Sequence, residues 1–190
     1  MDIRTALKGQ YKAGLAMLRD CIVKCPDDVW AAGMPVDPHP LAPPPPPSQG
    51  EGRWNQERES RTFWRIAYHC LFYTHLYAMQ REEDFVAWER HVEHAKEIYL
   101  GPEEDVPPIE TTYTQAEVLE YLDWMVTQVD GWVDALDLSS AESGFYWYKD
   151  FPKLDHQILN VRHIGTHVGQ LSERLFLAGI DTDWVSRGKG

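Results

Sequence analysis

Four long segments of this chain place their apolar residues three and four positions apart. That spacing gathers the apolar side chains on one face of an α-helix, so it predicts four amphipathic helices. The segments are residues 3–25, 60–80, 114–136 and 154–178. In the first segment the apolar stripe consists of Ile3, Leu7, Tyr11, Leu15, Leu18 and Ile22. No segment alternates apolar and polar residues over a useful length, so the sequence predicts no β-sheet.

Start and stop signals mark the ends of these helices. Pro26 ends the first helix, because proline lacks a backbone donor and clashes with the preceding turn. Ser60 is the expected N-cap of the second helix. Thr114 and Glu117 have the spacing of a capping box, which begins the third helix. Gly179 follows the last helix at the position where glycine commonly terminates one.

We therefore expect an all-α protein with the architecture of an up-down-down-up four-helix bundle. Residues 83–98 predict one extra, shorter and more polar helix. The chain has 190 residues, a length that suits a single domain spanning 1–190 with a real hydrophobic core.

Residues 31–58 form a proline-rich loop in this interpretation. They contain Pro35, Pro38 and Pro40, followed by an unbroken run from Pro43 to Pro47. Prolines fix φ and remove donors, so the stretch is neither helix nor inner strand and has polyproline II character. A docking segment for a proline-binding module is the alternative, but surface loops of this kind are far commoner.

The charge of the chain argues against two classes of partner. The formal net charge is −12, with 18 basic and 30 acidic residues. Nucleic acids and anionic membrane surfaces both attract clusters of Lys and Arg, so neither is expected to bind. The three cysteines do not form a disulfide framework, and no apolar run is long enough to span a membrane. We expect a cytoplasmic protein.

The last predicted helix carries histidines on one stripe. His163 and His167 are one helical turn apart, so both imidazoles can reach one point. A pair at this spacing is a good two-ligand unit for a metal, although alone it is a weak signal. His156 lies on the same stripe but about 10 Å below His163, too far to share an ion. Gly165 and Gly169 on this helix are expected to permit close approach of a neighbouring helix.

A third ligand is expected from His69, in the middle of the second predicted helix. A histidine in an apolar stretch must offset its desolvation, either through a hydrogen-bond partner or through a metal ion. Three such histidines on two core helices favour a metal site at His69, His163 and His167. His75 faces another direction, about 120° around the helix, and His91 and His94 are expected to be solvated.

These residues resemble the DinB-like (DinB/YfiT) superfamily. The segment HIGTHVGQL looks like the final-helix signature of this superfamily. The segment WRIAYHCLFYTHLY looks like the helix that carries its first metal ligand. The resemblance covers most of the chain, although the proline-rich insertion and the 83–98 segment depart from the shorter members. It implies one divalent ion, zinc or nickel, on His69, His163 and His167, and it also implies a homodimer.

Three functions are open at this point. The resemblance favours a metal-dependent S-transferase that joins a low-molecular-weight thiol to an electrophilic small-molecule substrate. The electrophile would enter beneath the aromatic loop at 137–153, and Tyr73 is expected to touch the site. A metal-dependent hydrolase is the second possibility, and it needs a general acid or base near the ion. The third is a non-catalytic metal-binding or stress-related protein, since fold does not fix function.

Overall fold

A computed structural model describes residues 2–33, 60–98 and 112–188, and these parts contain helices but no strand. The all-α class predicted from the sequence is therefore confirmed for the part of the chain that the structure describes. Its elements are α1 (Ile3–Lys24), α2 (Asp27–Trp30), α4 (Phe63–Tyr77), the short 3₁₀ helix η1 (Glu82–Asp84), α5 (Gln115–Ala135) and α6 (Lys153–Leu177). Among these helices none has the length and apolarity that crossing a bilayer requires.

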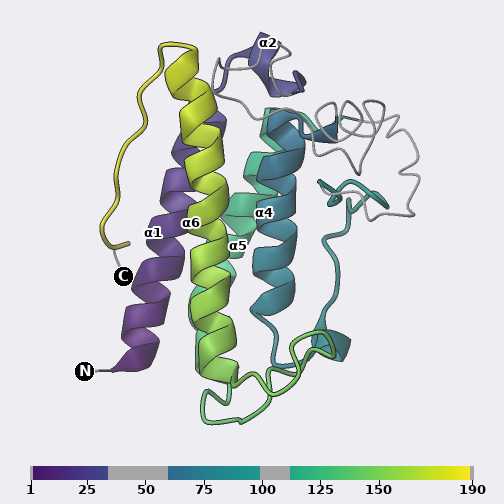
Figure 1. Cartoon of the computed structure of the whole chain (residues 1–190), viewed down its shortest axis with the longest axis vertical. Coiled ribbons are helices and arrows are strands. Elements are labelled where there is room, and N and C mark those ends of the chain that lie inside the picture. The colour runs from purple at the N-terminus through teal and green to yellow at the C-terminus, as the bar shows by residue number, and fades with distance from the viewer. Residues whose placement is uncertain (1, 34–59, 99–111, 189–190) are drawn as a thin grey trace, which may run out of the picture.

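Helices α1 and α5 lie side by side and run in opposite directions (Figure 1). At one end, the Arg4 guanidinium donates to the backbone carbonyl of Leu136, 2.7 Å away. At the other end, the Gln115 amide donates to the carbonyl of Ile22 at 3.2 Å. These two contacts join the beginning of each helix to the end of the other.

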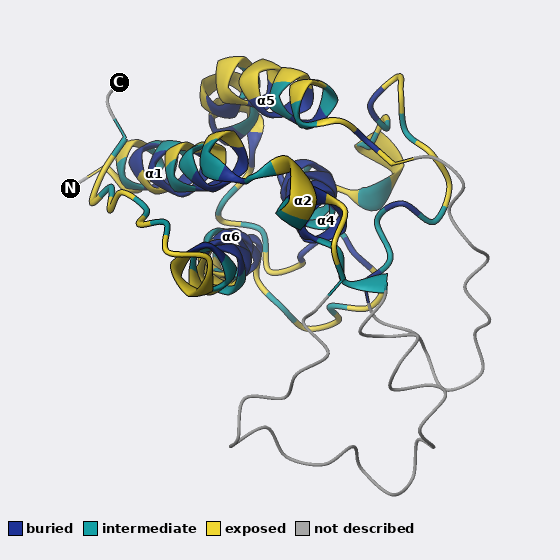
Figure 2. Ribbon diagram, turned by 90° about the horizontal axis from the view of Figure 1, so that it is seen from above, coloured by how far each residue is buried: buried dark blue, intermediate teal, exposed yellow. Residues whose placement is uncertain are grey.

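Helices α4 and α6 also pack in opposite directions, and α6 packs against α1 in the same direction. The Asn160 amide of α6 donates to the Thr74 carbonyl of α4 at 3.0 Å. Tyr11 of α1 donates to the side-chain oxygen of Gln157 at 2.7 Å. Consequently α1 and α6 run one way, and α4 and α5 run the other. Seen from above, the four long helices turn their buried faces toward one another (Figure 2).

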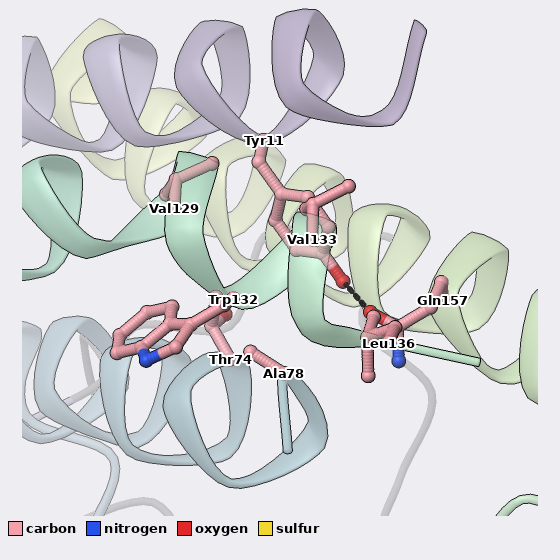
Figure 3. A pocket seen from close by; sticks show the side chains of 8 residues that line it. All are labelled: Tyr11, Thr74, Ala78, Val129, Trp132, Val133, Leu136 and Gln157. Atoms are coloured by element: carbon pink, nitrogen blue, oxygen red, sulfur yellow. Dashed lines mark hydrogen bonds between the residues drawn. The ribbon is translucent and has the colours of Figure 1, made fainter. Parts of the chain in front are cut away.

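The core between the helices is dense and rich in aromatic rings. Its largest fully buried side chains include Tyr11, Tyr68, Tyr121 and Met125. One small hollow remains beside Tyr11 and Gln157, with Trp132 and Thr74 on its other side (Figure 3). Its volume is about 10 Å³, which leaves room for no more than one water molecule. This hollow is a packing defect of the core and not a substrate site.

The helix ends follow the predicted signals with one exception. Thr114 and Glu117 form the expected capping box at the start of α5. Gly179, with a φ of 78°, ends α6 with paired hydrogen bonds from Gly179 and Ile180 back to the last turn. The N-cap of α4 is Thr62 and not Ser60, because the Thr62 hydroxyl accepts from the backbone N–H of Arg65.

The glycine prediction on α6 was wrong. An added Cβ at Gly165 or Gly169 would meet no atom within 4 Å, so neither glycine permits a close helix contact. The close contact instead involves Gly14 of α1, where a Cβ would lie 2.8 Å from the Ile164 side chain. The missing side chain of Gly14 therefore lets α1 and α6 approach each other.

The predicted helix at 83–98 was also wrong. After η1, residues 85–98 form turns and irregular backbone, with His94 at a positive φ of 63°. Side chains from elsewhere bind backbone carbonyl and N–H groups of this segment. Arg65 of α4 donates to the His94 carbonyl at 3.2 Å, and the Tyr113 hydroxyl accepts from the Val92 N–H at 2.8 Å. We call this segment, residues 85–98, the strap.

Two further segments complete the description. The short helix α2, absent from the prediction, seats Trp30, whose indole N–H donates to the Tyr113 carbonyl at 2.7 Å. Residues 180–188 run back along α1, where the Gly188 N–H donates to the Gly9 carbonyl at 2.9 Å (Figure 1). The proline-rich loop predicted at 31–58 lies, apart from 31–33, outside the described residues.

Candidate metal centre

The structure brings the three predicted histidines together. His69 lies in the middle of α4, and His163 and His167 lie one turn apart on α6. One ring nitrogen from each of the three lies within 4.8 Å of the other two. The antiparallel packing of α4 against α6 produces this meeting, because it places the middle of one helix opposite the middle of the other.

The spacing of the Nε2 atoms suits a single small ion. His163 Nε2 lies 3.0 Å from His167 Nε2 and 3.3 Å from His69 Nε2. An ion bound tetrahedrally at zinc–nitrogen distances separates its nitrogen ligands by roughly 3.3 Å. The observed separations are therefore close to those that such an ion requires.

Hydrogen bonds fix the tautomer of two of these rings. His69 Nδ1 lies 2.6 Å from the Lys96 backbone carbonyl, and His167 Nδ1 lies 2.9 Å from the Gln170 side-chain oxygen. Both partners only accept, so both Nδ1 atoms carry the proton and both Nε2 atoms present a lone pair. Oxygen acceptors behind the ring are the usual means of orienting metal-bound histidines.

His163 differs from the other two rings. Its Nδ1 is buried and has no hydrogen-bond partner among the described residues. Its Nε2 faces the lone pairs of both other histidines. Three imidazoles that converge in this way need a proton or a cation between them, so the donor set fits a metal ion.

All three rings are kept neutral at physiological pH. Burial lowers the pKa of His69 to about 3, and the charge that His167 would carry lowers it further. Burial, followed by the same repulsion from His167 and His69, lowers the pKa of His163 to about 2. Burial also lowers the pKa of His167, although its bond to Gln170 opposes the shift. Neutral imidazole is the form that binds metals.

Aromatic side chains border the triad. The ring of Tyr73 lies 4.7 Å from that of His69, and the ring of Tyr77 lies 6.3 Å from that of His163. Tyr73 was expected to touch the site, and it does. Both tyrosines also line a groove of about 510 Å³, together with Lys96 of the strap and Trp147. The triad therefore adjoins a groove with the volume of a small-molecule site.

The aromatic loop predicted at 137–153 does pack onto the helices. Phe145 is buried and its ring lies 5.6 Å from that of Tyr77. Trp147 is half exposed and forms part of the wall of the groove beside the triad. The loop thus provides one rim of this groove.

The other described histidines lie outside the metal-binding group, and their surroundings differ. His75 binds the Tyr121 hydroxyl through Nδ1 at 2.8 Å. His91 was expected to be solvated, but it is half-buried, stacks on Tyr68 and binds its hydroxyl at 2.7 Å. His156 is fully buried, and neither ring nitrogen has a partner among the described residues.

Sequence reasoning missed the groups that orient the ligands. Gln170 follows His167 by three residues on a helix, a spacing that a search for side-chain partners could have found. The Lys96 carbonyl could not have been found, because the strap was predicted to be a helix. The three cysteines are buried, unpaired and separate from the histidine group, in agreement with a structural role for Cys21, Cys25 and Cys70.

Comparisons of this chain with protein-family models, with curated proteins and with solved structures gave no match. The resemblance to the DinB-like superfamily therefore stays a prediction from the sequence.

Proposed function

We propose that this chain binds one divalent metal ion, zinc or nickel, through Nε2 of His69, His163 and His167. The convergence of the three Nε2 atoms supports this proposal most strongly, because two of them present lone pairs whose direction is fixed from behind. Imidazole is a good ligand for both metals. Three protein ligands leave a coordination position open, which is typical of catalytic rather than structural sites.

We propose further that the protein is a DinB-like four-helix bundle and a metal-dependent S-transferase for a low-molecular-weight thiol. The order of helix directions and the placement of the ligands on α4 and α6 agree with the architecture expected from the sequence. When bound, an ion on the triad would hold a thiol as thiolate, which is the nucleophilic form.

The residues around the triad have a defined part in this reaction. Tyr73 and Tyr77 border the histidines and would limit the access of water. The apolar wall formed by Phe72 and Trp147 suits the body of an organic electrophile. The Lys96 ammonium lies 5.2 Å from the Phe72 ring centroid and pairs with Glu93 at 3.6 Å and Glu97 at 3.5 Å, so an anionic group of a reactant would compete with these two carboxylates.

The composition of the ligand group favours thiol chemistry over hydrolysis, although one carboxylate, that of Glu82, lines the adjoining groove. A hydrolase needs a general acid or base within reach of the metal-bound water. Among the described residues, the group that could hold the ion contains no Asp or Glu. Hydrolysis and a purely metal-binding role are alternative outcomes of the tests below. The homodimer that the resemblance implies is tested separately, by measuring the mass of the purified protein in solution.

Metal content tests the first part of the proposal. The experiment compares wild-type protein with His69→Ala, His163→Ala and His167→Ala by elemental mass spectrometry after loading with zinc or nickel. His156→Ala is the matched control, since it removes another buried histidine from α6. We expect about one ion per wild-type and control chain and loss in each triad variant. Full metal content in any triad variant would refute the ligand set.

Thiol binding tests the second part. Cobalt(II)-loaded protein is titrated with N-acetylcysteine and, as a control, with N-acetylserine. A sulfur-to-cobalt charge-transfer band that appears only with the thiol, and not in His163→Ala protein, would support the transferase. A metal-loaded protein without such a band would contradict it, and screening would then turn to hydrolysis.

A further inference from the structure

A second groove, of about 470 Å³, lies on another side of α4 from the triad. Its walls come from α4 through His75, from residues 84–89 and from α5. His75 follows His69 by six residues, which places it about 120° away around the helix. The two grooves share no lining residue.

Three tryptophans line this groove: Trp88, Trp124 and Trp132. The Trp124 and Trp132 rings are 5.6 Å apart and meet at 72°, so they form two walls of a corner. His75 stacks on Trp132 at 4.9 Å, and Trp88 stacks on the buried Tyr121 at 4.8 Å. These stacking contacts hold the tryptophan rings in place, although 40% of Trp124 is exposed.

Carboxylates supply the charge of the groove. Asp84, Glu89 and Glu120 line it, and none of its lining residues is Lys or Arg. Glu120 is paired with Arg90 at 3.2 Å, whereas Asp84 and Glu89 form no ion pair with the residues that the structure describes. The Arg90 guanidinium also lies 5.9 Å from the Trp88 ring centroid, so a cation already contacts one of these rings.

We propose that this groove binds a small organic cation of the methylated-ammonium type. The faces of indole rings attract such cations, and tryptophan is the most effective aromatic residue for this purpose. The unpaired carboxylates add long-range attraction and would repel an anionic ligand. A bare metal ion is not expected here, because the carboxylates of this groove are not among the clustered metal-ligand groups of the described residues.

The test uses choline and its neutral tert-butyl analogue, which have nearly the same shape and differ in charge. Each is titrated into the whole protein while the indole N–H signals are followed by nuclear magnetic resonance. We expect choline to bind at least about tenfold more tightly than the analogue, with the largest shifts at Trp124 and Trp132. Equal binding of the two would overturn the proposal, since the groove would then recognise shape alone.

Two sets of variants place the site. Trp124→Ala is expected to weaken choline binding about tenfold, whereas Trp147→Ala is expected to leave it unchanged. Trp147 is the matched control because it is 39% exposed and lines the other groove. Asp84→Asn combined with Glu89→Gln is expected to weaken binding and to reduce its dependence on salt. Unchanged choline affinity in both Trp124→Ala and the double variant would also overturn the proposal.

This inference is independent of the metal centre. His163→Ala protein is expected to bind choline as wild type does, because the triad faces the other groove. Loss of choline binding in that variant, with the helix content retained, would place the cation at the triad instead and refute the second site.

Discussion

The ring of His69 donates from Nδ1 to the backbone carbonyl of Lys96, across 2.6 Å and between α4 and the strap. The irregular backbone at residues 85–98 therefore has a chemical consequence, because its path brings this carbonyl within hydrogen-bond distance of His69. The bond leaves Nε2 of His69 unprotonated and directed at α6. The strap, which the sequence wrongly predicted to be a helix, thus determines how the candidate ligand His69 is oriented.

The partner behind His167 leads to the first prediction. Gln170→Leu removes the oxygen that accepts from His167 Nδ1, so the ring loses its orientation and part of its basicity. We expect zinc binding to weaken about tenfold or more, as measured by competition with a chromophoric chelator. Gln128→Leu on α5 is the control, since among the described residues its amide donates to neighbouring Thr127 and to no ligand of the triad. Equal affinities in the two variants would show that Gln170 does not orient the ligand.

Metal binding should raise thermal stability. A ligand that binds only the folded state at 100 times its Kd stabilises it by about 2.7 kcal/mol. For a protein of this size that corresponds to a rise in Tm of roughly 5–10 °C. Scanning calorimetry of chelator-treated protein, with and without added zinc, measures this rise in Tm. The rise is expected to vanish in His163→Ala protein, and a rise that persists there would indicate binding elsewhere.

His156 predicts a dependence of stability on pH. Burial, and next the charge of Lys153, lower its pKa to about 3. The folded state therefore binds fewer protons than the unfolded state between about pH 6.5 and 3, so stability falls as the pH falls through this window. His156→Phe removes the titrating ring, and we expect a shallower loss of the free energy of unfolding between pH 6.5 and 4. Urea unfolding over that range provides the measurement.

The same substitution should stabilise the protein at neutral pH. His156 is enclosed by aromatic rings, including Phe145 at 4.7 Å and Tyr77 at 4.9 Å, and its nitrogens have no described partner. Replacing unpaired buried polar atoms by an apolar ring of similar shape is expected to contribute about 1–3 kcal/mol. A loss of stability at pH 7 would instead reveal that the imidazole makes a bond in solution.

Two glycine substitutions should have opposite effects. Gly169→Ala faces open space on α6, so the gain in helix propensity should raise the free energy of unfolding by about 0.5–1 kcal/mol. Gly14→Ala would place a methyl group 2.8 Å from Ile164, and the overpacking is expected to cost about 1–3 kcal/mol. Chemical denaturation at one pH measures the free energy of unfolding of both variants and of the wild type. Stabilisation by Gly14→Ala would mean that α1 and α6 separate easily.

The parts of this protein that were predictable are those governed by local rules. Apolar spacing located the four long helices to within a few residues, and the Thr114–Glu117 box and Gly179 marked their ends. The closeness of the three histidines was predictable for the same reason. Helical periodicity predicted the common face of His163 and His167, and the position of His69 in the middle of an apolar helix predicted the third ligand.

The parts that could not be predicted depend on contacts between distant residues. The strap forms turns instead of a helix, and Arg65 and Tyr113, remote in sequence, bind its backbone. No local propensity contains that information. The burial of His91 against Tyr68 follows from the path of the strap, so it was missed together with the strap. The close approach of α1 to α6 at Gly14 likewise depends on which helix faces which.

The ring nitrogens of His69 and His163 that face each other belong to residues 94 positions apart. A chain emerging from the ribosome therefore exposes the first of these imidazoles long before it has made the other two. Until α6 has been made, only one of the three donors exists, and a single imidazole holds an ion weakly. An ion could therefore be held by the complete triad only after α6 has been made, and a chain cut short before α6 would lack two of the three donors.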